Sequence, residues 1–312
     1  MVTQINKDEW LAVTAKYEGL SSLFFKPDFL DIIKDAFNYQ LHYFVAVQKQ
    51  APLFAAAIFS KGRDVVVPLA FTYSSIYIEN TISDRKRVDL LKSFIGLLKK
   101  DFKKISFRLD DELGDLRPFT WQGFKLGLRY TYIKEVKENV HHSVLRNVER
   151  AKSEGYDFKI GTVDKESIQK NLDDFSNYGL TKSAYPKYHQ LFERLSSMGY
   201  LKSFNIYLEE QLICSNIVLL DKNARKLYTL LVNKTSHKNA TSYLYKETID
   251  WCANNGYQSI DYCGANDESI ANFKSYFNPN LSPYYLVSYA PYKNLANNME
   301  LKFKTIIKRI IG

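Results

Sequence analysis

The feature that most constrains the fold is an order of predicted strands and helices that occurs twice. Each copy is a run of strands, a helix, a strand, a second helix and a last strand. The first copy has strands at 43–48, 53–60, 64–71 and 75–79, a helix at 84–101, a strand at 104–109, a helical patch at 116–123 and a strand at 128–136. The second has strands at 203–208, 212–220 and 226–232, a helix at 240–254, a strand at 258–263, a helix at 266–277 and a strand at 283–289. Residue identities barely match between the copies, so the repeat is one of pattern only.

Two copies of such a unit explain the 312 residues better than one large sheet would. We therefore expect an α/β (α+β) protein with two tandem domains, each a mixed, mostly antiparallel sheet flanked by helices. The domains are expected at 1–137 and 138–312. The second begins with a helical segment at 138–200 and ends with an amphipathic helix at 293–311.

The stretch 239–277 is predicted to carry the functional site. It contains a helix that Thr241 or Ser242 can cap, a short apolar strand ending near Asp261, a turn, and a second helix with Lys274. Asp261, Asn266 and Lys274 form a polar cluster at the carboxyl end of a buried strand, where open α/β folds usually bind ligands.

Charge and composition restrict the class of partner and the compartment. The formal net charge is +9, which favours nucleic acid, a phosphorylated cofactor or an acidic membrane surface; a soluble protein with a basic surface is the alternative. The N-terminus lacks a signal-peptide pattern, and no apolar run approaches the length of a membrane span. The three cysteines stand in apolar runs without paired spacing, so we predict that they are reduced residues of the core. These features predict a cytoplasmic protein.

The C-terminal segment 293–311 alternates apolar and basic residues at helical spacing. Its apolar side has Leu295, Met299, Phe303, Ile306, Ile307 and Ile310, and its charged residues include Lys302, Lys304, Lys308 and Arg309. Such a helix either lies on an anionic membrane or packs on its own protein with solvated lysines. The segment therefore predicts either peripheral membrane association or packing on the protein itself.

Several kinds of catalytic site are not expected. His141 and His142 are adjacent and would point apart on a helix, and no Cys or acidic partner has ligand spacing, so no metal site is predicted. The sequence has no serine or cysteine nucleophile elbow and no phosphate-binding loop of the Walker type. A covalent hydrolase is therefore not expected.

Two further motifs, together with the repeated pattern, carry a family resemblance. After the first copy comes Leu145-Arg146-Asn147-Val148-Glu149-Arg150-Ala151-Lys152 with Gly155, and the second copy contains Tyr257 to Gly264 followed by Ile270-Ala271-Asn272-Phe273-Lys274 and Phe277. The first is similar to the Arg-rich helix, and the second to the Asp…Gly…Phe-Lys…Phe signature, of the FemABX aminoacyltransferases. The chain thus resembles these proteins and the related GNAT acyltransferases over nearly its whole length.

The resemblance implies an acyl-transfer site within 203–290 and roles for particular residues. By motif match, Lys274 lies beside the reacting carbonyl, Arg146 grips an anionic part of the acceptor, and Phe273 forms a wall of the site. Asp261 either orients Lys274 or takes a proton, or it is a strand-end carboxylate satisfied by the turn that follows. Arg146 and Arg150 either bind phosphate or belong to a solvated helix face. Asn266 belongs to the polar cluster of the site, and Tyr262 either lines the groove or packs in the core. The first copy, whose turn at 107–111 lacks a following Phe-Lys pair, is expected to have no active site of its own.

The sequence also departs from the family. Ser269 stands where the family has a glycine, and no long coiled-coil arm is present. The loop 232–240 lacks the glycines with which GNAT enzymes cradle the pyrophosphate of coenzyme A. Either Lys234, Lys238, Asn239 and Thr241 at a helix N-terminus bind the donor phosphates, or coenzyme A is not the donor.

Two functions therefore remain open. The first is an N-acyltransferase that moves an acyl or aminoacyl group from acyl-CoA or aminoacyl-tRNA to an amine of a small anionic acceptor, such as a sugar nucleotide or cell-envelope precursor. The second is a degenerate fold of the same type that has lost catalysis and binds RNA or an acidic partner.

Overall fold

The computed structural model describes residues 1–291 apart from residues 50, 69–70, 72 and 176–179. The helix expected at 293–311 lies outside the described residues. No helix in the described part of the chain is long and apolar enough to cross a membrane.

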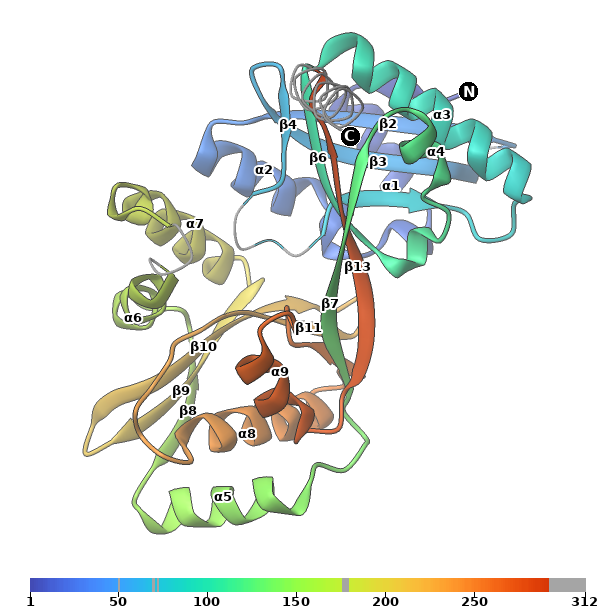
Figure 1. The fold of residues 1–312 in the computed structure, drawn as a ribbon. Helices are drawn as coiled ribbons and strands as arrows, with labels where there is room; N and C mark the ends of the chain where they lie inside the picture. Colours follow the sequence, from blue (N-terminus) through green and yellow to red (C-terminus); the bar gives the residue numbers. More distant parts are fainter. Residues whose placement is uncertain (50, 69–70, 72, 176–179, 292–312) are drawn as a thin grey trace, which may run out of the picture.

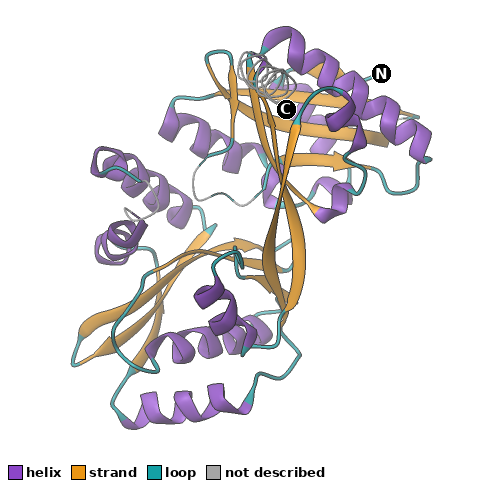
Figure 2. Ribbon diagram, in the orientation of Figure 1, coloured by secondary structure: helices purple, strands orange, loops and turns teal. Residues whose placement is uncertain are grey.

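Two lobes are joined at a narrow waist by a pair of long strands, β7 (Lys125–Glu135) and β13 (Asn280–Tyr289), as Figure 1 shows. Within the described residues the strands form one 13-stranded sheet, in the order β1-β2-β3-β4-β6-β13-β7-β12-β11-β10-β9-β8, with β5 beside β3. Helices lie against this sheet in both lobes (Figure 2). The sheet is thus shared by the two halves of the chain.

The first lobe is built mainly from the first half of the chain. Its helices are α1 (Lys7–Thr14), α2 (Pro27–Phe37), α3 (Asp84–Asp101) and α4 (Arg117–Trp121), and its strands are β1 (Thr3–Ile5), β2 (Gln40–Gln48), β3 (Ala51–Lys61), β4 (Asp64–Val66), β5 (Ser75–Ile78) and β6 (Lys104–Asp110). Local sequence explains several helix ends. Asn6 and Glu9 form a reciprocal cap at the start of α1, and Ser83 caps α3.

The second lobe holds the remaining elements. Its helices are α5 (His142–Ser153), α6 (Lys165–Phe175), α7 (Tyr185–Ser197), α8 (Ala240–Asn254) and α9 (Glu268–Ser275), and its strands are β8 (Asp157–Gly161), β9 (Leu201–Leu208), β10 (Gln211–Asp221), β11 (Lys226–Val232) and β12 (Ser259–Asp261). α5 and α8 cover one face of the sheet, and α6 and α7 lie on the side of the first lobe (Figure 1).

The last strand of each half pairs with strands of the other half. β7 ends the first half, yet it lies antiparallel to β12, with Lys134 opposite Ile260. β13 ends the second half and pairs with β6, where Val287 is opposite Phe107. Because each lobe takes a strand from the other half, neither 1–137 nor 138–312 contains its whole sheet, and the boundary after residue 137 stays a prediction.

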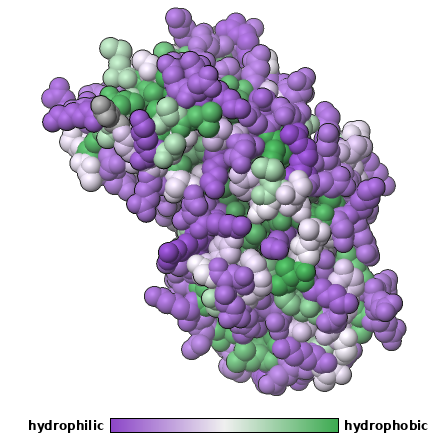
Figure 3. All heavy atoms as spheres, turned by 180° about the vertical axis from the view of Figure 1, so that it is seen from behind, coloured by the Kyte–Doolittle hydropathy of each residue, from purple (hydrophilic) through white to green (hydrophobic). Residues whose placement is uncertain are grey.

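Three apolar clusters hold the fold together. One lies between the sheet and α3 and α4, and a second between the sheet and α5, α8 and α9. The third joins the lobes, because it combines α1 and α2 with α6, α7 and buried residues of β10 and β11. Seen from behind, hydrophilic residues cover most of the surface and apolar ones show in patches, some between the lobes (Figure 3).

Buried polar contacts also fix the lobes relative to each other. Asp221 of the second lobe is 1% exposed, and its carboxylate accepts hydrogen bonds from the Ser22 hydroxyl at 2.6 Å and the Leu23 N–H at 3.0 Å. The Tyr200 hydroxyl donates to Asp28 at 2.6 Å. Charge-assisted bonds of this kind are stronger than neutral ones, so we infer a defined geometry at the waist.

The predicted elements agree with the observed ones except at a few places. β8 was not predicted, and β4 takes only Asp64–Val66 of the strand predicted at 64–71. The helix predicted at 266–277 is shorter, because Asp267 caps α9 by accepting from the Ser269 and Ile270 N–H groups. α8 begins after Asn239, in the left-handed conformation with φ 65°, so the predicted caps Thr241 and Ser242 are wrong.

Candidate acyl-transfer site

Two parallel strands part near the waist. β11 and β12 pair over three residues, the last pair being Tyr228 and Asp261, and β12 then ends. β11 continues to Val232, and its only described partner there is β10. The edge of β11 beyond Tyr228 therefore keeps backbone N–H and C=O groups that a ligand can pair with.

Asp261 sits where the strands part and is fully buried. Its carboxylate accepts hydrogen bonds from the Tyr73 hydroxyl at 2.8 Å, the Thr131 hydroxyl at 2.6 Å and the Cys263 N–H at 2.8 Å. None of these bonds comes from Lys274, which the sequence predicted as its partner. The arrangement ties three segments of chain to one carboxylate.

Lys274 reaches from α9 to the turn that follows β12. The side chain is 7% exposed, and its ammonium donates to the carbonyls of Tyr262 at 2.6 Å and Gly264 at 2.8 Å. Burial lowers the pKa of Lys274 to about 8, although nearby Cys263 and Asp261 favour the charged form. An ammonium has three donors, and these carbonyls take two of them.

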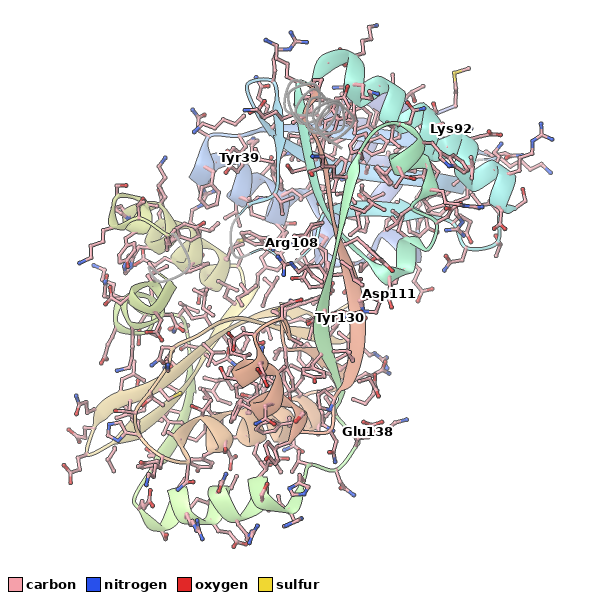
Figure 4. All side chains as sticks on the ribbon, viewed as in Figure 1. Tyr39, Lys92, Arg108, Asp111, Tyr130 and Glu138 are labelled. Atoms are coloured by element: carbon pink, nitrogen blue, oxygen red, sulfur yellow. The ribbon has the colours of Figure 1, made fainter. Side chains whose placement is uncertain are left out.

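The turn under Lys274 is attached to β7. Cys263 and Gly264 both have positive φ, of 53° and 127°, and the second value is one that glycine adopts readily. The Asn266 amide bonds to both the N–H and the carbonyl of Tyr130, each at 2.9 Å. Tyr130 lies on the stretch of β7 that runs beside β13, where it pairs with Pro283 (Figure 4). Asn266, predicted to bind substrate, is thus occupied by the backbone of β7.

The first half of the chain contributes to this site through residues that the sequence did not single out. Tyr73 donates to Asp261, and burial together with that carboxylate raises the pKa of Tyr73. Its ring lies 6.4 Å from that of Tyr228, and Tyr228 also contacts Phe24 at 5.4 Å. Arg108 lies at the same waist, where its guanidinium donates to the Phe71 carbonyl at 2.7 Å (Figure 4).

Asp110, at the end of β6, faces the same region. Burial raises the pKa of Asp110 to about 6; Glu112 and Asp111 add to the shift and Lys226 opposes it. Since the folded-state pKa of Asp110 lies above the ordinary value of 3.8 for an aspartate, the folded protein binds more protons than the unfolded chain between these pH values. The stability that the folded protein gains from the protonated Asp110 carboxyl is therefore present below about pH 4 and is lost as pH rises through about 6.

Replacing Asp110 by Asn is therefore expected to stabilise the protein near neutral pH. The free energy of unfolding should rise by about 2 kcal/mol at about pH 8 and change little at about pH 4. Urea denaturation at both pH values measures this. The exposed Asp89→Asn on α3 is the control. Equal stability of D110N and the wild type at about pH 8 would contradict the prediction.

Two predicted site residues face the other side of the sheet. Successive strand residues point to opposite faces, so Tyr262 turns away from Asp261 toward α8. Its ring lies 5.0 Å from that of Tyr245, and Phe273 is 5.5 Å from Tyr245. The Tyr262 hydroxyl is buried and has no hydrogen-bond partner among the residues that the structure describes. Contact of Tyr262 and Phe273 with substrate stays a prediction.

The two predicted arginines lie away from Lys274. Arg146 and Arg150 are exposed on α5, which packs on α8 at the far end of the second lobe (Figure 1). Asn147, the neighbour of Arg146, donates to the Ser242 hydroxyl at 3.3 Å in the first turn of α8. Arg146 is therefore level with the start of α8, and the structure does not bring it into the waist.

The predicted donor residues gather at the start of α8. Lys234 and Lys238 are exposed in the loop that joins β11 to α8, while Asn239 and Thr241 are partly exposed. No side chain in the described part of the chain caps the first turn of α8, so its N–H groups can bind an anion. One carboxylate already enters this loop, because Asp174 of α6 accepts the Lys234 N–H. The structure thus brings these four residues to one place, at the end of β11.

The described residues also offer no group of three His, Cys, Asp or Glu side chains that could hold a metal ion.

Comparisons with known proteins agree with this geometry. Residues 139–275 match the family model described as an acetyltransferase (GNAT) domain. No curated protein matches the chain by sequence.

Solved structures resemble the whole chain. The structure of FemX aligns with a TM-score of 0.63 at 12% identity, covering 96% of this chain and 100% of that one. A tandem GNAT protein from the clavulanic acid biosynthesis pathway aligns with a TM-score of 0.55 at 11% identity, covering 92% and 97%. The C-terminal domain of a protein described as a lysylphosphatidylglycerol synthetase, from Agrobacterium fabrum, gives 0.55 at 10%, covering 95% and 96%. Residues 139–275 thus match the GNAT family model, and the whole chain has a fold similar to those of FemX and the tandem GNAT protein.

Proposed function

We propose that the protein transfers an acyl or aminoacyl group from an activated donor to an amine, at the point where β11 and β12 part. The observation that carries this proposal is the juxtaposition there of three features. These are an open strand edge beyond Tyr228, the uncapped N-terminus of α8, and the buried ammonium of Lys274. Each feature meets one need of acyl transfer. The open strand edge can hold the donor, the helix N-terminus can neutralise the donor's phosphates, and the ammonium can stabilise the charge that develops on the carbonyl oxygen.

The donor would lie along β11 with its phosphates toward α8. Lys234 and Lys238 supply positive charge, and the helix N-terminus supplies N–H donors and a favourable dipole. These groups suit the phosphates of coenzyme A and equally the terminal phosphates of aminoacyl-tRNA. Both donor classes remain in the proposal.

In the transfer step the acceptor amine attacks the donor carbonyl carbon. The carbonyl oxygen becomes an oxyanion, a proton leaves the amine, and the thiol or the tRNA hydroxyl departs. Lys274 has one ammonium proton beyond the two that bond to carbonyls, and we assign that proton to the oxyanion. Asp261 holds the turn beneath Lys274, accepts a hydrogen bond from the Tyr73 hydroxyl, and stays a candidate for the proton.

The acceptor would enter at the waist, from the side of the first lobe. The net charge of +9 and Arg108 at the waist favour an anionic acceptor. The resemblance to FemX and to a lysylphosphatidylglycerol synthetase favours a cell-envelope precursor, a sugar nucleotide or a lipid-linked amine acceptor. A cytoplasmic enzyme that works at the membrane surface fits these acceptors.

Donor binding tests the proposal. Thermal unfolding of the full chain is followed with coenzyme A, acetyl-CoA and bulk aminoacyl-tRNA, each at low and moderate salt. One donor class at about 100 times its dissociation constant should stabilise the fold by about 2.7 kcal/mol. The double variant K234E/K238E should lose most of this shift, because it reverses the charge that faces the phosphates.

The matched control is K159E/K222E, which changes two exposed lysines of the same lobe, on β8 and on the β10–β11 turn. It should keep the shift. Stabilisation by neither donor class at either salt concentration would count against the enzyme.

A second function has one observation in its favour. The loop after β11 has no glycine, and the Asp174 carboxylate occupies one of its N–H groups. A catalytically inactive GNAT-like fold that binds RNA fits this arrangement. RNA affinity would then fall steeply with salt, as phosphate-driven binding does, and K274M would not alter it.

A further inference from the structure

An exposed tryptophan stands between two cations on the outer surface of the first lobe. Trp121, at the end of α4, is 57% exposed. The Lys92 ammonium lies 5.2 Å from its ring centroid and the Arg117 guanidinium 5.5 Å. Arg117 is partly neutralised by Asp115 at 2.9 Å. A large exposed aromatic ring flanked by lysine is typical of a surface that meets another molecule.

Two exposed leucines continue this surface along β7. Leu126 is 39% and Leu128 51% exposed. They follow Phe124, which is buried beneath α4, at strand spacing, so all three point to the side of the sheet that carries α3 and α4. In Figure 1, α4 lies beside the upper end of β7, with α3 next to it. We call Lys92, Trp121, Leu126 and Leu128 the Trp121 face.

Basic residues outnumber acidic ones near the tryptophan. α3 carries six basic residues, of which Arg85, Lys86, Lys92 and Lys100 are exposed (Lys92 is labelled in Figure 4), against three acidic ones, Asp84, Asp89 and Asp101. The stretch 116–134 contains no acidic residue, although its exposed Lys125 and Arg129 alternate with the two leucines and so point to the other face of β7. Long basic side chains can hold their charged ends at a polar boundary while their stems cover apolar surface.

The chain also leaves the described fold at this place. β13 ends at Tyr289, whose ring lies 5.0 Å from that of Phe124 and 4.7 Å from the Lys99 ammonium. The rest of the sequence, 292–312, carries five basic residues (Lys293, Lys302, Lys304, Lys308 and Arg309) among apolar ones. Tyr289 and Lys99 thus extend the aromatic and basic character of this side of the lobe.

We propose that the Trp121 face docks on an anionic phospholipid surface. Tryptophan favours the membrane interface, leucine side chains enter the acyl boundary, and each nearby lysine or arginine adds electrostatic attraction. A nucleic acid would use the tryptophan and the cations but not the two leucines. The leucines therefore favour lipid. This surface goes beyond the C-terminal segment alone, and it is independent of the proposed acyl transfer.

The test is flotation of the full chain with phosphatidylcholine vesicles, with and without phosphatidylglycerol. The wild type should float only with phosphatidylglycerol present. K92E should weaken binding at least about fivefold, since one basic residue near the surface has about that effect. The double variant W121A/L128N should weaken it further. In a W251F background, brominated lipid should quench the fluorescence of Trp121, because the one other remaining tryptophan, Trp10, is fully buried.

Two controls separate this face from other causes. Lys159 of β8 also lies over an aromatic ring, 5.1 Å from Tyr207 on the other lobe, so K159E should float as the wild type does. The tail variant I306D/I307D should retain quenching of Trp121 in whatever fraction still floats. The proposal is overturned if W121A/L128N and K92E float like the wild type. It is equally overturned if vesicles do not bind and single-stranded RNA binds in a Trp121-dependent way.

Discussion

Replacing Lys274 by Met is expected to lower kcat/KM for acyl transfer by about 10²–10³-fold, once a donor and acceptor are in hand. The variant keeps the apolar stem in its buried position and removes the only group assigned to the oxyanion. The loss should be largest at low pH. Burial holds the pKa of Lys274 at about 8, so the wild type loses the charge of this ammonium as pH rises through that value. The difference in kcat/KM between the wild type and K274M should therefore become smaller above about pH 8.

A second buried lysine provides the matched control. Lys134 of β7 is fully buried, and its ammonium also bonds to two carbonyls, those of Glu138 at 2.9 Å and Asn139 at 3.4 Å. K134M should cost stability in the same way as K274M but leave turnover within severalfold. Equal losses of turnover in the two variants would mean that Lys274 acts only by holding the turn at Tyr262 and Gly264.

Replacing Asp261 by Ala is expected to cost about 3–5 kcal/mol of unfolding free energy. The substitution leaves the Tyr73 hydroxyl, the Thr131 hydroxyl and the Cys263 N–H without their acceptor, at about 1–3 kcal/mol for each well-buried donor. Chemical denaturation at neutral pH measures the difference. Tyr73→Phe removes one of the three bonds and should cost about 1 kcal/mol. A stability of D261A within about 1 kcal/mol of the wild type would show that the carboxylate does not join the two halves.

Local signals made much of the fold predictable. The bounds predicted for the helix at 84–101 and for the strand at 226–232 are the observed ones. Ser83 caps the start of that helix, and the strand consists mostly of buried apolar residues. The start of α9 was harder to place, since Asp267 had to be recognised as its cap. β8 was missed because its five residues begin with Asp157, end with Gly161 and form no clear alternation of buried and exposed positions.

Non-local features could not be predicted from one sequence. The exchange of β7 and β13 depends on which edges meet after the chain has folded, and no local pattern specifies this. The contact of Tyr73 with Asp261 spans 188 positions of the sequence. Among 23 tyrosines nothing local marked Tyr73. Motif order did predict that Asp261 and Lys274 share one turn, but it placed Arg146 in a role that its exposed position on α5 does not favour.

The central claim is that a carbonyl group is passed to an amine where β11 and β12 part. Its most direct test is transfer of label from acetyl-CoA, or from aminoacyl-tRNA, into amide linkage with a pool of cell-envelope precursors, read by mass spectrometry. The wild type and K134M should form a labelled amide from one donor class, and K274M should form about a hundredth as much or less. Binding of a donor without any labelled amide, or equal label with K274M, would contradict the claim.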